Sequence, residues 1–281
     1  MGARPPLLAD AGRILALVAI LGVPSPAAAQ DLPADGETAN QRLDASPRHG
    51  EWVTYDAGGG DAVSAWVVYP ERSDPAPVVV VIHEIYGLTD WIRAVADQAA
   101  AAGYIAIAPD LLSGKGPGGG GTASMDQQGS VAAIRGLPRE EVNRRLVAAA
   151  EYAMALPSAA PRVASVGFCW GGTTSFELAV AYPELDGAVV YYGGSPATGK
   201  LATIQAPVLG LYGGNDNRVN ATIPDAEAEM GRLGKRFEPV TFDGAGHGFL
   251  RQQSGQDGAN MEATRQAWPR TVAFFREVLG S

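Results

Sequence analysis

Cysteine is almost absent from this chain, which has one, Cys169, in 281 residues. A lone cysteine has no intramolecular disulfide partner, so disulfides cannot hold the fold together. The hydrophobic composition of 46% is ample for one large core in a chain of this length. In an oxidising compartment, where small secreted folds use paired cysteines, a single thiol is better explained by reactivity than by stability.

Basic residues are also few, with 21 Lys and Arg against 30 Asp and Glu and a net charge of −9. The sequence contains no basic run and no RNA-binding motif. This balance argues against nucleic acid and anionic membranes as partners. Long apolar runs are missing too, because none reaches the roughly 20 residues that a membrane-spanning helix needs. We therefore expect no nucleic acid as a partner, and no membrane once an N-terminal signal has been cleaved. We also expect a small-molecule substrate and a monomer.

The first 29 residues have the pattern of a secretory signal. Arg4 and Arg13 precede an apolar run at 14–23, and Pro24-Ser-Pro-Ala-Ala-Ala29 provides a small-residue cleavage site. Cleavage near Ala29 predicts a periplasmic or secreted protein. The mature chain then has 19 basic and 29 acidic residues, a net charge of −10.

The remaining chain divides into a polar tail and one domain. Residues 30–48 contain scattered Pro, Asp and Gly, which predicts a flexible N-terminal tail. Residues 49–281 alternate strand and helix patterns, which predicts a single α/β domain with a mostly parallel, doubly wound sheet of seven to eight strands. Strands are expected at 52–55, 62–69, 78–82, 104–109, 163–168, 187–192, 208–212 and 237–242, and helices at 90–102, 138–156, 170–181, 223–233 and 262–279.

The least regular part of the domain is the glycine-rich stretch within 110–137. Gly114-x-Gly116-x-x-Gly119 formally matches a dinucleotide-binding fingerprint. It does not follow its strand directly, and Pro117 without a following helix is the wrong context, so we reject the match. A mobile loop near a pocket is the preferred interpretation.

The chemistry is indicated by residues 163–172, which read V-A-S-V-G-F-C-W-G-G. A β-branched strand runs into Gly167, Cys169 and Gly171, with a helical pattern directly after. This is the glycine-x-nucleophile-x-glycine elbow of a strand-to-helix turn, with cysteine at the nucleophile position. Free cysteines are often inert and buried, but the flanking glycines favour Cys169 as a nucleophile.

A cysteine nucleophile needs a histidine base and a carboxylate that orients it. In folds with such an elbow the acid and then the base follow the nucleophile. Of the three histidines only His247 follows Cys169. Asp216, after a strand and a glycine turn, is the preferred acid. Asp225, at the start of a predicted helix, and Asp243, close to His247, are the competitors.

A second polar segment, H-E-I-Y-G, begins at His83 at the end of a buried strand, where α/β sheets bind ligands. Gly87 stands where a zinc motif of the H-E-x-x-H type has its second histidine, so we expect no metal. An oxyanion hole takes one amide from this loop and one from the residue after the nucleophile. These amides would belong to Ile85 and Trp170.

Four motifs in this order, H-E-I-Y-G-L, G-F-C-W-G-G, Y-G-G-N-D and G-A-G-H-G-F-L-R, resemble those of the dienelactone hydrolases, or carboxymethylenebutenolidases. The resemblance covers residues 52–279. It implies an α/β-hydrolase fold, a Cys169–His247–Asp216 triad and no cofactor. It also implies that Glu84 meets the thiol and accepts its proton when substrate binds. A carboxylate beside a thiol disfavours the thiolate and keeps the resting cysteine unreactive.

The resemblance also bears on substrate binding. Family members that act on dienelactone hold the substrate carboxylate with two arginines, and Arg251 matches one of them. Tyr86 is expected to bind substrate as well. The second arginine has no clear counterpart, with Arg135 and Arg139 as candidates. The secretory signal is another departure, because the chloroaromatic pathway is cytoplasmic. Both departures leave the exact lactone open.

The leading hypothesis is a hydrolase that cleaves a lactone or activated carboxylic ester through a thioester at Cys169. One alternative is a promiscuous secreted carboxylesterase with a different natural ester. Another is a non-catalytic binding protein on a hydrolase scaffold. The presence of Cys169, His247, Asp216 and Glu84 argues strongly against this alternative.

Overall fold

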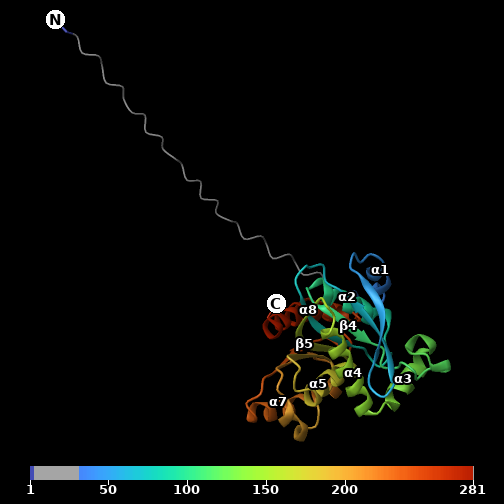
Figure 1. The fold of residues 1–281 in the computed structure, drawn as a ribbon. Helices are drawn as coiled ribbons and strands as arrows, with labels where there is room; N and C mark the ends of the chain where they lie inside the picture. Colours follow the sequence, from blue (N-terminus) through green and yellow to red (C-terminus); the bar gives the residue numbers. More distant parts are fainter. Residues whose placement is uncertain (3–31, 281) are drawn as a thin grey trace. The chain divides into compact units, whose positions relative to one another are not determined.

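The computed structural model describes residues 1–2 and 32–280 and contains one eight-stranded sheet with helices on both faces (Figure 1). The predicted signal peptide at 1–29 lies outside the described residues, apart from residues 1–2. Among the described helices, none has the length and apolar character to cross a membrane.

The strand order is β1-β2-β4-β3-β5-β6-β7-β8. Strands β1 and β2 form an antiparallel pair, β2 is antiparallel to β4, and all other neighbours are parallel. The predicted doubly wound, mostly parallel sheet is confirmed. The strands are β1 (Gly50–Asp56), β2 (Ala62–Val68), β3 (Ala76–Ile82), β4 (Ile105–Pro109), β5 (Ala159–Phe168), β6 (Gly187–Tyr191), β7 (Val208–Gly213) and β8 (Phe237–Phe242).

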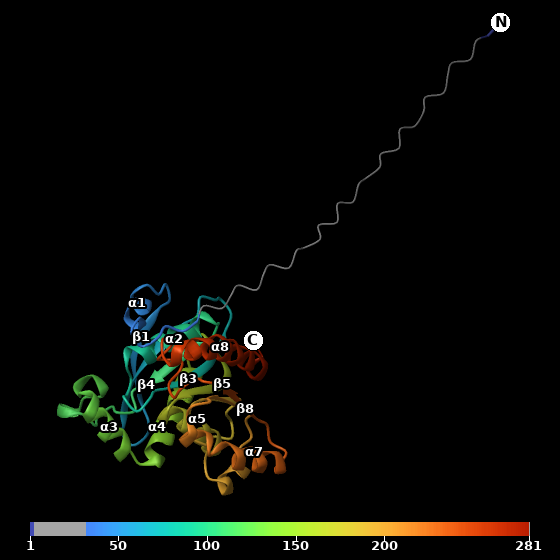
Figure 2. The same ribbon diagram turned by 180° about the vertical axis from the view of Figure 1, so that it is seen from behind.

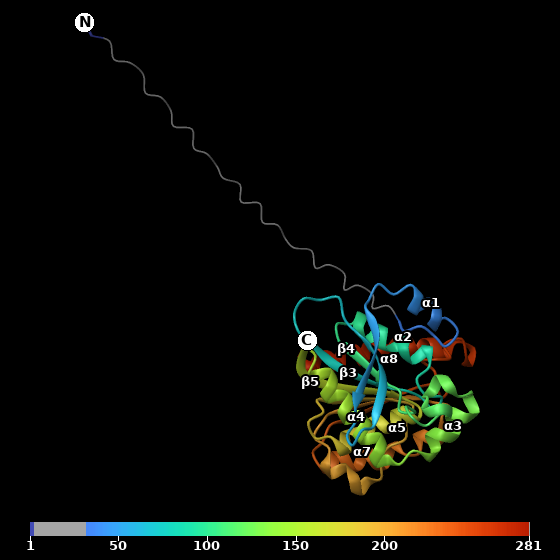
Figure 3. The same ribbon diagram turned by 45° about the vertical axis from the view of Figure 1, so that its right-hand side comes forward.

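Helices cover both faces of the sheet (Figures 2 and 3). One face packs against α2 (Asp90–Ala101) and α8 (Ala259–Leu279). The other packs against α4 (Arg139–Met154), α5 (Trp170–Ala181) and α7 (Ile223–Arg232).

The burial of strand β3 explains why its sequence is apolar at every position. All seven of its residues are buried. Val79 and Val81 pack into the core on the α2 side, while Val78 and Val80 pack into the core on the α4 side. Because both faces of the strand are covered, it has no polar alternation, and its carboxyl end delivers the following loop to the site.

The region 110–137 contains more structure than the sequence predicted. Two 3-10 turns, Pro117–Gly119 and Thr122–Ser124, precede a helix, α3 (Gln127–Gly136). The carboxylate of Asp126 caps this helix by accepting a hydrogen bond from Gly129 N–H at 2.7 Å. Helix α3 buries little of its surface, so it lacks the apolar stripe on which the prediction relied; its N-cap aspartate was the available signal.

The N-terminal segment differs from the expected flexible tail at 30–48. Residues 32–48 lie against the domain and contain a short helix, α1 (Ala39–Asp44), with Ala39 buried in the core. A polar segment of this kind is fixed by tertiary hydrogen bonds that composition does not reveal. The bonds run from Gly36 N–H to Arg251 O at 2.8 Å, from Trp91 Nε1–H to Ala34 O at 3.0 Å, and from Gln253 Nε2–H to Pro33 O at 2.9 Å.

Candidate active site

Cys169 occupies a strained turn between the end of β5 and the start of α5. Its φ is +57°, a left-handed value that is unusual for a residue other than glycine. The adjacent glycines are required by close backbone approach. A Cβ on Gly167 would lie 1.9 Å from Gly171 O, and one on Gly171 would lie 2.3 Å from His83 O. The turn therefore presents a half-buried thiol at the carboxyl edge of the sheet.

His247 is brought to this edge by the loop that follows β8. Its Nδ1 lies 2.5 Å from Asp216 Oδ2. Asp216 stands between β7 and a single helical turn, α6 (Asn217–Asn220), whose Val219 N–H donates to its other carboxylate oxygen at 3.4 Å. The carboxylate is thus held by the helix start and faces the imidazole, which suits an orienting role.

The imidazole also interacts with Cys169. Burial of the ring opposes its charged form. Hydrogen bonds and charge interactions with Cys169 and Asp216 outweigh this burial and raise the pKa of His247 to about 9. The three side chains therefore form one connected group, in the order thiol, imidazole and carboxylate.

The two competing carboxylates lie elsewhere. Asp225 is in the first turn of α7, and Asp243 is in the turn after β8, where both are exposed. Negative charge in a first helical turn is favourable by itself. Among the described residues, Asp216 is the carboxylate that contacts the His247 ring.

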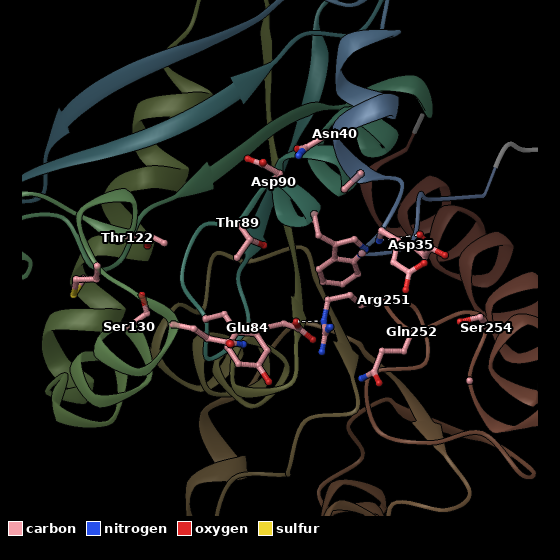
Figure 4. A pocket seen from close by; sticks show the side chains of 18 residues that line it. Asp35, Asn40, Glu84, Thr89, Asp90, Thr122, Ser130, Arg251, Gln252 and Ser254 are labelled. Carbon is pink, nitrogen blue, oxygen red and sulfur yellow. Dashed lines mark hydrogen bonds and ion pairs between the residues drawn. The ribbon is translucent and has the colours of Figure 1, made fainter.

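Glu84 contacts Arg251, whereas the resemblance implied contact with the Cys169 thiol. Arg251 Nε–H donates to Glu84 Oε2 at 2.6 Å (Figure 4). Glu84 is almost fully buried, and a buried carboxylate requires a charged or hydrogen-bonding partner. The turn after His247 supplies that partner, and Arg251 also lies over the Tyr86 ring, 5.4 Å from its centroid.

The Glu84 carboxyl nevertheless interacts electrostatically with His247. Burial raises the pKa of the Glu84 carboxyl, and the charges of Arg251 and His247 offset this only in part. Tyr192, which the sequence did not single out, lies beside this group. Its ring meets the His247 ring edge-on at 5.2 Å. The pKa of the Tyr192 phenol is raised by burial and then by the charges of Glu84 and Cys169.

His83 supports the loop that carries Glu84. Its Nε2 accepts a hydrogen bond from Leu111 N–H at 3.3 Å, so the proton of a neutral ring is on Nδ1, which donates to Glu84 O at 2.7 Å. Burial lowers the pKa of His83 and keeps the ring neutral. The ring also stacks on Trp170 at 5.6 Å. His83 therefore links the loop after β3 to the elbow.

The two candidate oxyanion-hole amides lie at the expected places in the fold. Trp170 is the first residue of α5, so its N–H has no carbonyl partner within its own helix. Ile85 lies in the loop after β3, and β3 is paired directly with β5, the strand that ends at the elbow. The N-terminus of α5 lies directly after Cys169, and a helix N-terminus favours negative charge beside it.

A cavity of about 720 Å³ adjoins Glu84 and Arg251 (Figure 4). It is lined by the N-terminal segment, the loop after β3, the start of α2, residues 122–130 and the turn after His247. Tyr86 lines it, whereas Cys169 and His247 do not. Glu84 and Arg251 line this cavity, and the charge of His247 acts on the Glu84 carboxyl. The glycine-rich loop leads into the segment from which Thr122 and Met125 face this cavity.

The two candidates for a second substrate-binding arginine are not in this cavity. Arg135 lines a neighbouring hollow that shares Tyr86. Arg139 pairs with Glu177 at 2.6 Å and lies over the Trp170 ring. Among the described residues, no group of three or more His, Cys, Asp or Glu side chains is arranged to hold a metal ion.

Comparison with known proteins gives a consistent result. Residues 63–279 match the model of the dienelactone hydrolase family. The chain is similar to a "Putative carboxymethylenebutenolidase" of Saccharolobus solfataricus, with 30% identity over 80% of this chain and 98% of that protein. It is also similar to one of the same name from Salmonella typhimurium, with 33% identity over 79% and 85%.

Solved structures with dienelactone hydrolase in their names also superpose on this chain. A dienelactone hydrolase structure from Klebsiella pneumoniae, titled as putative, superposes with a TM-score of 0.72 at 26% identity, covering 81% of this chain and 98% of that one. A dienelactone hydrolase-like promiscuous phosphotriesterase from metagenomic libraries superposes with a TM-score of 0.70 at 26% identity, covering 82% and 98%.

Proposed function

Because the chain belongs to the dienelactone hydrolase family, we propose that it cleaves a lactone or activated carboxylic ester through a thioester at Cys169. Membership makes it a hydrolase of ester or lactone bonds. The observation that carries the more specific proposal is the contact of Asp216 with a His247 ring that also interacts with an elbow cysteine. A nucleophile, a base and an orienting acid on one connected path suit covalent acyl transfer.

In the first half of the reaction, Glu84 accepts the proton of the Cys169 thiol, and the thiolate sulfur bonds to the carbonyl carbon. The carbonyl oxygen gains negative charge and is stabilised by the N–H groups of Ile85 and Trp170. The pKa of His247 is about 9, so its ring is already an imidazolium near neutral pH. When the bond from carbon to the leaving oxygen breaks, this imidazolium gives that oxygen a proton. The alcohol, or the opened end of a lactone, leaves and the acyl group remains as a thioester.

In the second half, water replaces the leaving group. The His247 imidazole takes a proton from water as its oxygen bonds to the thioester carbonyl carbon. The carbon–sulfur bond then breaks, the carboxylic acid departs, and the thiolate regains its proton from Glu84. Asp216 keeps the ring oriented and stabilises its charged form in both halves.

Glu84 is proposed as the first acceptor of the thiol proton. Its raised pKa suits a base at neutral pH better than an ordinary carboxylate would. The ion pair with Arg251 supports a switch. An acceptor oxygen on the substrate that binds Arg251, with Tyr86 beside it, competes for the guanidinium and releases Glu84 to move towards the sulfur. The resting thiol then stays protonated until substrate is present, which limits its oxidation.

The test is a hydrolysis screen of 4-nitrophenyl esters and butenolides, with Cys169→Ala as the control. We expect turnover by the wild type, none by the variant, and an intact-mass increase equal to the acyl group when turnover is stopped early. Hydrolysis that survives Cys169→Ala would contradict the nucleophile. Hydrolysis without an acyl adduct on Cys169 under any trapping condition would contradict the thioester.

A further inference from the structure

The N-terminal segment lines the cavity beside Glu84 and Arg251, although it lies outside the family match, which begins at residue 63. Asp35, Gly36, Glu37, Ala39 and Asn40 all line the cavity. Figure 4 shows Asp35 and Asn40 across the cavity space from Glu84. The segment is therefore a wall of the cavity as well as an ordered start of the domain.

Hydrogen bonds fix this wall close to the proposed substrate-binding arginine. Gly36 N–H donates to the carbonyl oxygen of Arg251 at 2.8 Å. A Cβ on Gly36 would lie 3.1 Å from Arg251 Cγ, so backbone and side chain are in direct contact. The Asp35 carboxylate holds the turn by accepting from Glu37 N–H at 3.0 Å and Thr38 N–H at 2.9 Å. A shift of Gly36 would therefore break its hydrogen bond to Arg251.

The charge of the cavity is unbalanced. Asp35, Glu37, Glu84 and Asp90 all line it, and of these Asp90 is paired with Arg93, which does not line the cavity. Of the described residues that line it, Arg251 is the one cation, and its guanidinium already pairs with Glu84. The remaining lining side chains are hydroxyls, amides, aromatic rings and small apolar groups. A carboxylate that enters meets repulsion from the wall and must compete with Glu84 for Arg251.

We propose that residues 35–40 form a specificity wall that selects esters and lactones whose cavity-bound acyl group is uncharged over those that carry a carboxylate there. This inference rests on the proposed function and names its substrate class. The substrate oxygen that binds Arg251 and releases Glu84 is then a neutral acceptor, such as a hydroxyl or carbonyl. The hydroxyl and amide groups of the lining suit such a substrate.

The test compares two esters that differ in charge but closely match in shape. In mono-4-nitrophenyl adipate a carboxylate replaces the terminal methyl group of 4-nitrophenyl hexanoate. The variant is Asp35→Asn/Glu37→Gln, in which the asparagine keeps an acceptor for the turn. The control is Glu227→Gln, an exposed position on α7 that does not line the cavity. Unchanged circular dichroism and melting temperature establish that the double variant is folded.

We expect the double variant to raise kcat/KM for the adipate ester by roughly three- to tenfold, as removal of nearby like charges in a partly solvated cavity would. The value for the hexanoate ester should stay within about twofold, and the control should change neither. Salt at about 1 M should shrink the wild-type discrimination, because exposed charges are screened. An unchanged adipate-to-hexanoate ratio in the double variant would overturn the specificity wall and leave the hydrolase proposal intact.

A binding measurement separates the two proposals if turnover is absent. The same esters are titrated onto Cys169→Ala, with and without the wall substitutions. We expect the hexanoate ester to bind more tightly than the adipate ester, and we expect the wall substitutions to reduce this difference in affinity. That result supports the specificity wall even if the wild type hydrolyses neither ester. In that case the proposed function alone fails. Equal binding of both esters overturns the wall.

Discussion

The His247 imidazole has a pKa of about 9 because two partners outweigh its burial. In Asp216→Asn the charged partner is replaced by a neutral amide. We expect the pKa of His247 to fall and kcat/KM to drop by about 10²–10⁴-fold, since the orienting carboxylate is lost. An imidazole NMR titration gives the pKa and a steady-state assay gives the rate. Asp243→Asn is the matched control and should change neither.

The same pKa predicts how stability depends on pH. The unfolded value is 6.5 and the folded value about 9, so folding favours the protonated ring. The contribution of His247 to the free energy of unfolding is therefore fully present below pH 6.5 and is lost as the pH rises through 9. Urea unfolding of the wild type and Asp216→Asn at pH 6 and pH 10 measures this. A wild-type preference for pH 6 that does not shrink in the variant would contradict the pairing.

Glu84→Gln tests the proton acceptor. Glutamine keeps an oxygen that can accept from Arg251, so we expect the variant to fold, but its amide cannot take a proton from the thiol. Turnover should fall by roughly 10²–10⁴-fold, the usual effect of a lost general base. Iodoacetamide labelling of the resting variant reports its thiolate. Turnover close to the wild type would make Glu84 a structural partner of Arg251 only.

Some residues of the candidate site could be predicted from the sequence, and others could not. The elbow pattern and chain order led to Cys169, His247 and Asp216, and the structure brings these three side chains together. The pairing of Glu84 with Arg251 could not be read in this way. The two residues are 167 positions apart, and each had been assigned a different partner by its own motif.

At the scale of an element, the elbow depends on backbone contact that a single methyl group would prevent. In Gly171→Ala the new Cβ would lie 2.3 Å from His83 O and 2.4 Å from Ile82 O. We expect the free energy of unfolding to fall by roughly 3 kcal/mol or more, since neither backbone can yield easily. The matched control is Gly199→Ala, where a Cβ meets nothing within 4 Å. Chemical denaturation measures the free energy of unfolding of both variants, and equal values would contradict the predicted clash.

Elements were predictable where they bury an apolar pattern. Strand β3 and helix α5 were found because both pack into the core. Helix α3 and the segment 32–48 were not found, because their positions depend on caps and hydrogen bonds to distant residues. The segment is tied to Arg251 and Gln253 near the other end of the chain. The composition of a short segment does not predict its contacts with residues far away in the sequence.

For the whole molecule we propose export, followed by removal of the signal at 1–29. We expect intact-mass analysis of the exported protein to give an N-terminus near Gln30 or Asp31, because the small residues before it form the cleavage site. Replacing Ala27 and Ala29 by bulky residues should block processing. A soluble cytoplasmic protein that retains Met1 would contradict export.

The order in which the chain is made has a consequence for the thiol. Cys169 is synthesised well before residues 247–251, which bring the imidazole to the sulfur and Arg251 to Glu84. Until residues 247–251 are made, the sulfur lacks the imidazole that we propose as its base, Glu84 lacks Arg251, and Gly36 N–H lacks the Arg251 carbonyl oxygen. In the proposed mechanism the nucleophile is therefore complete only after residues 247–251, which are made about 80 positions after Cys169, have docked.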